Sequence, residues 1–188
     1  MAIQTRTRIN NEAYERLALS DDDRTWELWD GILREKPGMS TAHNDVANEV
    51  GYMLRSQLDR SQYRVRVDSG RLHRPRSTYF VPEVFVVPSA YVTPNLDHHG
   101  LEIYDQPLPV VVEVWSPSTG DYDIEVKLVV YQQRGDRKIW FIHPYERTLT
   151  AWRLQPDGRY AETLYREGIV RPIALPGVDI DLDALFDM

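Results

Sequence analysis

The sequence predicts an α/β (α+β) fold in which a β-sheet is flanked by helices, and three observations predict it. The segment Pro109–Trp115 carries a run of valines and is typical of a strand buried on both faces, as in the middle of a helix-covered sheet. A predicted helix over 121–134 and a predicted strand over 138–143 follow it. Such strand–helix–strand units pair their strands in parallel with a right-handed crossover. Apolar residues at helical spacing between positions 46 and 58 predict one more long helix.

The first hundred residues alternate between helical periodicity, period-two alternation and turn signals. Ser40 or Thr41 can cap the long helix, because a hydroxyl accepts a hydrogen bond from a free N–H in the first turn. The elements expected here are a helix over 10–19, a strand over 26–33, a helix from about 41 to 60, strands over 63–69 and 79–87, and a polar loop over 88–106.

The predicted helix over 121–134 ends at Gly135, a residue that favours helix termination. Ile124, Leu128 and Tyr131 lie at helical spacing and are expected to face the core. Lys127 falls on the same stripe, where a lysine is out of place unless it has a function or its amino group reaches water. The remaining elements expected are a strand over 138–143, a β-hairpin over 148–154 and 159–165, and a short terminal element over 182–186.

Length and composition set limits on the class of protein. With 188 residues, 42% hydrophobic, we expect a single soluble domain over 1–188. The absence of cysteine excludes disulfides, thiolate catalysis and cysteine-bound zinc. No apolar run is long enough for a membrane span and the first residues lack a hydrophobic signal core, so we expect a cytoplasmic protein without membrane contact. A net charge of −7 argues against non-specific coating of nucleic acid, but permits an enzyme with a local basic patch.

Three glutamates, Glu27, Glu83 and Glu113, each interrupt an apolar strand-like run. A buried carboxylate is costly unless it is paired or bound to a metal. Clustered carboxylates repel one another unless a cation joins them or a proton is shared. Oxygen-only ligands favour a hard ion, so the sequence predicts Mg²⁺ or Mn²⁺. The alternatives are a Glu113 paired with an arginine and a Glu27 exposed on an edge strand.

A metal-bound water beside a lysine is suited to hydrolysing a phosphodiester, and Lys127 is the candidate lysine. The alternative is that Lys127 has no catalytic role and that its side chain reaches solvent from the edge of the helix. His43, at the start of the long helix, points along the buried face and is either part of this site or a packed core histidine. His98 and His99 lack the spacing of a zinc site, and we interpret His143 as structural.

Between positions 55 and 76 the chain carries a local excess of five positive charges, from seven arginines and two aspartates. Such a patch can contact phosphates, although a solvated outer face explains it equally well. The arginines predicted to bind nucleic acid are Arg64, Arg66, Arg71 and Arg74.

Several motifs together carry a resemblance to a known family. They are Trp26–Gly31, His43 at a helix start, Val81–Val84, Val112–Thr119, Glu125–Tyr131, Ile139–Pro144 and Leu175–Ile180. In this order they resemble the Uma2 family, described as putative restriction endonucleases, over roughly residues 10–187. The Glu-Val-Trp-Ser-Pro-Ser-Thr run followed by Lys-Leu is fairly specific to that family.

The resemblance implies a restriction-endonuclease-like core of the PD-(D/E)xK type over about 24–145, with a mixed β-sheet flanked by helices, and a C-terminal β extension over about 146–188 that includes the hairpin. It implies that Glu83, Glu113 and the Val114 carbonyl bind the metal and that Glu27 supports the site. Two residues depart from the superfamily pattern. Glu83 stands where aspartate is usual, and Trp115 stands where the lysine is usual, so Lys127 takes the role of that lysine.

The leading hypothesis is therefore a metal-dependent endonuclease that hydrolyses DNA, with Glu83, Glu113, Lys127, Glu27 and His43 as its catalytic residues. We expect DNA as its partner and a homodimer as its assembly. The alternative is a nuclease-like fold that binds nucleic acid or a protein without cutting. A hydrolase of small phosphorylated substrates is the third hypothesis, and the lack of a glycine-rich phosphate loop argues against it.

Overall fold

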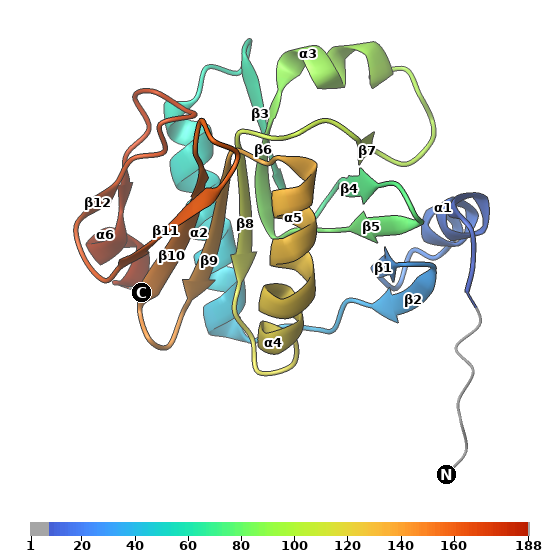
Figure 1. Ribbon diagram of the computed structural model, residues 1–188, viewed down its shortest axis with the longest axis horizontal. Coiled ribbons are helices and arrows are strands. Elements are labelled where there is room, and N and C mark those ends of the chain that lie inside the picture. The colour runs from blue at the N-terminus through green and yellow to red at the C-terminus, as the bar shows by residue number, and fades with distance from the viewer. Residues whose placement is uncertain (1–7, 188) are drawn as a thin grey trace.

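The computed structural model describes residues 8–187 (Figure 1). Its helices are α1 Asn11–Ser20, α2 Thr41–Gln57, α3 Ser89–Val92, η1 Thr93–Asn95, α4 Gly120–Tyr122, the π-helical turn η2 Asp123–Lys127, α5 Leu128–Arg134 and α6 Leu182–Phe186. Its strands are β1 Trp26–Trp29, β2 Ile32–Glu35, β3 Tyr63–Val67, β4 Arg71–Arg74, β5 Thr78–Phe80, β6 Val84–Pro88, β7 Ile103–Tyr104, β8 Val110–Val114, β9 Lys138–His143, β10 Thr148–Leu154, β11 Tyr160–Tyr165, β12 Ile169–Val170 and β13 Ile180–Asp181. None of the helices in this part of the chain is long and apolar enough to cross a membrane.

The central sheet has the strand order β11-β10-β9-β8-β6-β3. Strands β8 and β9 are parallel, as the strand–helix–strand unit predicts, and the other neighbours are antiparallel. The sheet is therefore mixed, and β10 and β11 form the predicted hairpin. A second sheet has the order β2-β1-β5-β4-β7, and β12 pairs with β13.

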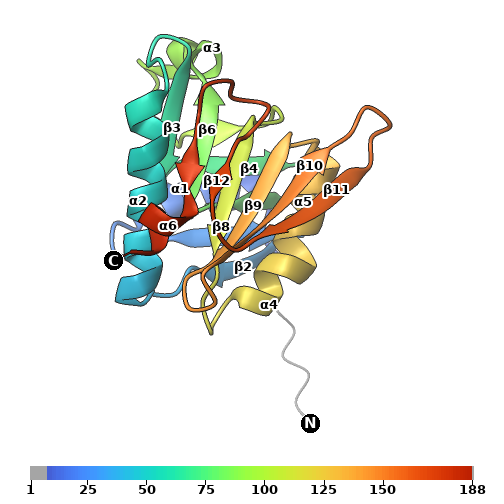
Figure 2. The ribbon, with the colours of Figure 1, turned by 90° about the vertical axis from the view of Figure 1, so that its left-hand side faces the viewer.

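Helices cover both faces of the central sheet, which confirms the predicted fold class (Figures 1 and 2). Helix α2 packs Val46, Val50 and Leu54 against one face of the sheet. Helix α6 packs on the same face. The α4–α5 helix covers the other face with Leu128 and Tyr131. Because side chains alternate along a strand, the valines at 110, 112 and 114 of β8 face α2, whereas Val111 and Glu113 face α4–α5.

Gly51 lies where α2 crosses β3, and a Cβ there would come within 2.6 Å of Val67 Cγ2. We expect Gly51→Ala to lower the free energy of unfolding by about 1–2 kcal/mol, because the overlap outweighs the gain in helix propensity. Gly38→Ala is the control, since a Cβ at Gly38 would meet nothing within 4 Å. Urea unfolding of both variants measures the difference, and an unchanged Gly51→Ala midpoint would contradict the packing argument.

The single strand predicted over 26–33 is wrong, because the structure has a hairpin of β1 and β2 there. Asp30 and Gly31 form its two-residue turn with φ angles of 47° and 78°. Positive φ at both positions is characteristic of the type I′ turn that favours Asp-Gly. The hairpin brings Lys36, just after β2, back beside Thr25, to whose carbonyl its backbone N–H donates.

The strand predicted over 79–87 is also wrong as one element, since β5 and β6 belong to different sheets. Pro82 lies at the break and has no N–H to donate to a strand ladder. The preceding N–H, that of Val81, donates to the Glu27 side chain at 2.9 Å instead. The chain therefore crosses between sheets at Val81–Glu83, which leaves Glu83 at the start of β6.

Two further expectations need correction. Residues 88–106 are not all loop, because they include α3, η1 and β7. Ile124 does not face the core, as its side chain is 49% exposed. The π turn η2 explains this, since one extra residue in a turn rotates the preceding residues about the axis by about 100°. Asp123 and Lys127 are buried in its place.

Candidate active site

Glu83 and Glu113 are neighbours because of strand pairing. Strands β6 and β8 are antiparallel with Val84 opposite Val112, so the residue before β6 lies beside the end of β8. Both glutamates are at most 2% exposed. The Val114 N–H lies beyond the start of β6 and donates to Glu83 Oε2 at 3.2 Å. Because the N–H and C=O of one strand residue point to the same side, the Val114 carbonyl faces Glu83 as well.

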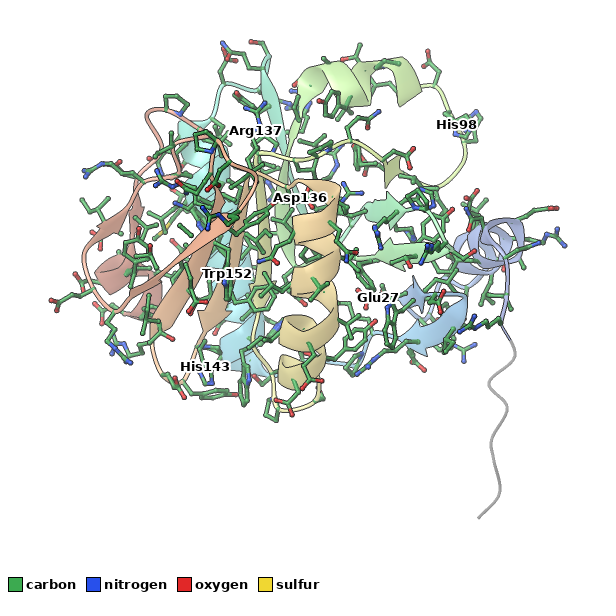
Figure 3. The ribbon with its side chains drawn as sticks, viewed as in Figure 1. Glu27, His98, Asp136, Arg137, His143 and Trp152 are labelled. Carbon is green, nitrogen blue, oxygen red and sulfur yellow. The ribbon has the colours of Figure 1, made fainter. Side chains whose placement is uncertain are left out.

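Lys127 joins three carboxylates from three elements. Its Nζ lies 3.0 Å from Glu27 Oε1 on β1, 3.3 Å from Glu113 Oε1 and 3.4 Å from Asp123 Oδ1. Asp123 and Lys127 lie four residues apart and so share one side of the helix, and both are buried. Figure 3 shows Glu27 on the side of β1 that faces the α4–α5 helix. Tyr131 Oη, one turn further, donates to Glu113 Oε1 at 2.5 Å.

Glu83 has two further neighbours from other elements. Lys36 Nζ lies 3.1 Å from Glu83 Oε1 and 2.7 Å from Asp68 Oδ1. His43 reaches the site from the first turn of α2, where the Ser40 side chain caps the helix. Its Nε2 is buried 3.6 Å from Glu83 Oε1, too far for a hydrogen bond, and has no hydrogen-bond partner.

Burial and charge push the pKa values of the two glutamates apart. Burial alone raises the pKa of Glu83, but the Lys36 ammonium, together with Glu113, His43 and Lys127, outweighs burial and holds that pKa well below the usual range. Burial and the negative charge of Glu83 raise the pKa of Glu113 well above the usual range, against the opposing charge of Lys127. A close pair with separated pKa values shares one proton when no cation lies between the carboxylates.

The charge of this cluster fits a divalent cation. Four buried carboxylates, Glu27, Glu83, Glu113 and Asp123, face two buried ammonium groups, those of Lys36 and Lys127. The formal excess is two negative charges, which buried groups tolerate only with protons or a cation. Within residues 8–187 no three His, Cys, Asp or Glu side chains already stand in the arrangement of a metal site. Glu83, Glu113 and the Val114 carbonyl supply the oxygen donors that Mg²⁺ and Mn²⁺ favour.

The structure brings the five predicted catalytic residues, Glu27, Glu83, Glu113, Lys127 and His43, into one cluster. Their burial is as predicted, and their roles stay predictions. Three cluster residues were not predicted, namely Lys36, Asp123 and Tyr131. Only Asp123 carried a sequence signal, because it precedes Lys127 by four residues and oppositely charged residues at this spacing pair on a helix.

The predicted nucleic-acid-binding arginines do not gather at this cluster. Arg64 is paired with Val87, at the end of β6 remote from Glu83 and about 13 Å along the strand. Arg66 binds Glu102 with N–O distances of 2.7–3.0 Å, and Arg71 Nε donates to Tyr14 Oη at 3.2 Å. Arg74 lies on β4, in the other sheet. Phosphate binding by these arginines stays a prediction.

Asp123 makes stability depend on pH. Burial raises its pKa from 3.8 to about 6, against the charge of Lys127. The folded state therefore binds this proton more tightly than the unfolded state, and the stability it adds is lost as pH rises through about 6. In EDTA, we expect Asp123→Asn to remove about 1 kcal/mol of the stability difference between pH 5 and pH 7.

Urea unfolding at the two pH values measures this effect, with the exposed Asp121→Asn as the matched control. Equal pH dependence in wild type and Asp123→Asn would show that the carboxyl titrates normally.

Comparisons with known proteins agree on the kind of fold. A sequence model of the Uma2 family, described as "Putative restriction endonuclease", matches residues 11–183. No curated protein matches the chain. Among solved structures, the chain is similar to a "putative nuclease belonging to DUF820" from Anabaena variabilis ATCC 29413, with a TM-score of 0.76 and 18% identity. That match covers 92% of this chain and 96% of the other, and at such identity it shows the fold alone.

Proposed function

The chain belongs to the Uma2 family of putative restriction endonucleases, and from this premise we propose that it is a metal-dependent endonuclease that hydrolyses phosphodiester bonds in DNA. One observation carries the proposal. Glu83 and Glu113, which are 30 positions apart in the chain, lie together in a buried cluster with an excess of two negative charges and two lysines. Such a cluster is suited to a divalent cation and a phosphate rather than to an apolar ligand.

Each side chain has a role that follows from its position. Glu83, Glu113 and the Val114 carbonyl hold Mg²⁺ or Mn²⁺. When bound, the ion polarises a phosphoryl oxygen and acidifies a water. Lys127 is held by Glu27 and Asp123, so its ammonium stays charged and positions an attacking water or the phosphate.

His43 and Lys36 complete the site. The unpartnered His43 Nε2 has a free hydrogen-bonding position beside Glu83, which suits a phosphate oxygen. Lys36 keeps Glu83 ionised, and an ionised carboxylate is the form that binds a metal.

Cleavage and metal binding test the proposal together. Supercoiled plasmid DNA is incubated with the purified protein in Mg²⁺, in Mn²⁺ or in EDTA. We expect nicked and linear DNA with either metal and intact plasmid in EDTA. Calorimetry with Mn²⁺ should detect binding to wild type and at least tenfold weaker binding to Glu83→Gln, since a carboxylate ligand is lost. Binding of Mn²⁺ that is equal in both proteins would overturn the assignment of Glu83.

A second candidate function is a nuclease-like domain that binds nucleic acid or a protein without cutting. It is favoured by the ion pairs that Glu83 and Glu113 already make with Lys36 and Lys127. These pairs give each of the two carboxylates a cationic partner without a metal. The same calorimetry separates the two functions, because no binding at millimolar Mn²⁺ would support the non-catalytic domain.

A further inference from the structure

A cavity of about 210 Å³ opens directly beside the carboxylate cluster. Glu113 and Asp123 form one end of it, and the rest lies over β9, β10 and β11 where the α4–α5 helix leaves the sheet uncovered. Figure 3 shows Trp152 and His143, which line it, on the sheet beside that helix. The volume is below the roughly 300–1,000 Å³ of a pocket for a drug-sized molecule, which indicates a smaller ligand.

Small side chains create the space. Thr148 and Thr150 lie two residues apart on β10, so both point to the face that bears Phe141 and His143, their partners on β9. The two threonine side chains are smaller than the aromatic rings of their partners on β9, so the space above them stays open. Trp152, two residues further along β10, closes the cavity at the end away from His143.

The His143 ring is fixed as a flat wall of this cavity. Its ring stacks on Trp115, with centroids 4.2 Å apart and planes at 20°. The Glu146 backbone N–H donates to His143 Nδ1 at 3.0 Å, so the proton lies on Nε2. Trp115 in turn lies against Gly120, where a Cβ would come 2.1 Å from the indole Nε1. His143 thus stands between Trp115, which directly follows β8, and Thr148 on β10.

We propose that this cavity binds an unpaired nucleobase of the nucleotide next to the phosphate at the proposed metal site. The inference rests on the proposed function and adds the substrate class, a nucleic acid with at least one unpaired nucleotide. The walls suit a flat, uncharged heteroaromatic ring, because aromatic faces stack on bases of any sequence and threonine hydroxyls can bond their edges. A phosphate inside the cavity is disfavoured, since its lining includes three carboxylates, those of Glu113, Asp123 and Glu146, against one guanidinium, that of Arg166.

The base can come from a single strand or be extruded from a duplex. Both sources present the same ring to the cavity. Binding of the base must therefore be measured with a backbone that carries no charge and cannot be cleaved. Short DNA strands with an uncharged, uncleavable methylphosphonate backbone meet this need. One strand carries a central base, and its partner strand has an abasic residue at that position.

Fluorescence anisotropy measures the affinity of each strand without metal. We expect wild type to bind the strand with a base about tenfold more tightly than the abasic strand, within the range for one base–aromatic stack. Thr150→Phe, which fills the cavity, and His143→Ala, which removes the wall, should abolish this preference, whereas His143→Phe should retain it. Thr163→Phe is the matched control, because Thr163 is exposed and pairs with Ala151, which faces α2.

Equal affinity of wild type for the two strands would overturn the inference, as would an unchanged preference in Thr150→Phe. Neither result touches the proposed function, which is tested by metal-dependent cleavage. Matched and singly mismatched duplexes then identify the source. Tighter binding of the mismatched duplex that Thr150→Phe removes indicates an extruded base, and binding confined to single strands indicates a strand substrate.

Discussion

Replacing Glu113 by glutamine is expected to lower the rate of Mg²⁺-dependent DNA cleavage by at least about a hundredfold. The change removes one of the carboxylates proposed to bind the metal while keeping the shape of the side chain. A metal's stabilisation of transition-state charge amounts to several kcal/mol, and about 2.7 kcal/mol corresponds to a hundredfold change in rate. Plasmid cleavage under single-turnover conditions measures the effect.

The same substitution should leave the free energy of unfolding unchanged or higher. Glu113 is buried beside Glu83, whose charge raises its pKa, so its ionised form is disfavoured in the folded protein. A glutamine relieves that repulsion, and its Oε1 can still accept the hydrogen bond from Tyr131. Lys127 keeps Glu27 and Asp123 as partners. Loss of cleavage with full stability would therefore separate function from folding.

Glu125→Gln is the matched control, because Glu125 is an exposed glutamate on η2, the helical turn that also carries Lys127. It should cleave at the wild-type rate. Wild-type cleavage by Glu113→Gln would show that the phosphodiester is hydrolysed elsewhere or by a contaminant.

Much of the fold could be predicted where the hydrophobic pattern had a single reading. The strand over 138–143, the first hairpin strand over 148–154 and the terminal helix over 182–186 have the predicted bounds. The valine-rich run with Glu113 is a central strand, as expected. In these segments, local periodicity and tertiary packing favour the same structure.

The hydrophobic pattern gave wrong predictions where the chain reversed or left one sheet for another, and where a π turn changed the helical period. Asp30 and Gly31 reversed a run that looked like one strand, and Pro82 divided another between two sheets. The π turn η2 rotated Ile124 outward and Asp123 inward, which a period of 3.6 residues does not anticipate. Both unpredicted charged residues of the site follow from these events, since Lys36 depends on the hairpin and Asp123 on the π turn.

Replacing Lys127 by methionine is expected to destabilise the metal-free protein by about 3–5 kcal/mol at pH 8. The substitution keeps the length of the side chain but removes the ammonium that lies within 3.4 Å of Glu27, Glu113 and Asp123. Loss of one partner from a buried ionic group has a cost of this size, because the remaining charges stay desolvated and repel one another. Urea unfolding measures the loss.

The pH dependence and a double substitution identify the cause of that loss. The charge of Lys127 opposes the burial that raises the pKa values of Glu113 and Asp123, so without it both values should rise further and stability should recover as pH falls from 8 to 5. Adding Glu27→Gln to Lys127→Met should restore part of the stability at pH 8, which a double-mutant cycle measures as a coupling energy. A loss that stays constant with pH and is not reduced by Glu27→Gln would mean that Lys127 acts through packing of its aliphatic chain, and the charged cluster at the centre of the proposed site would lose its basis.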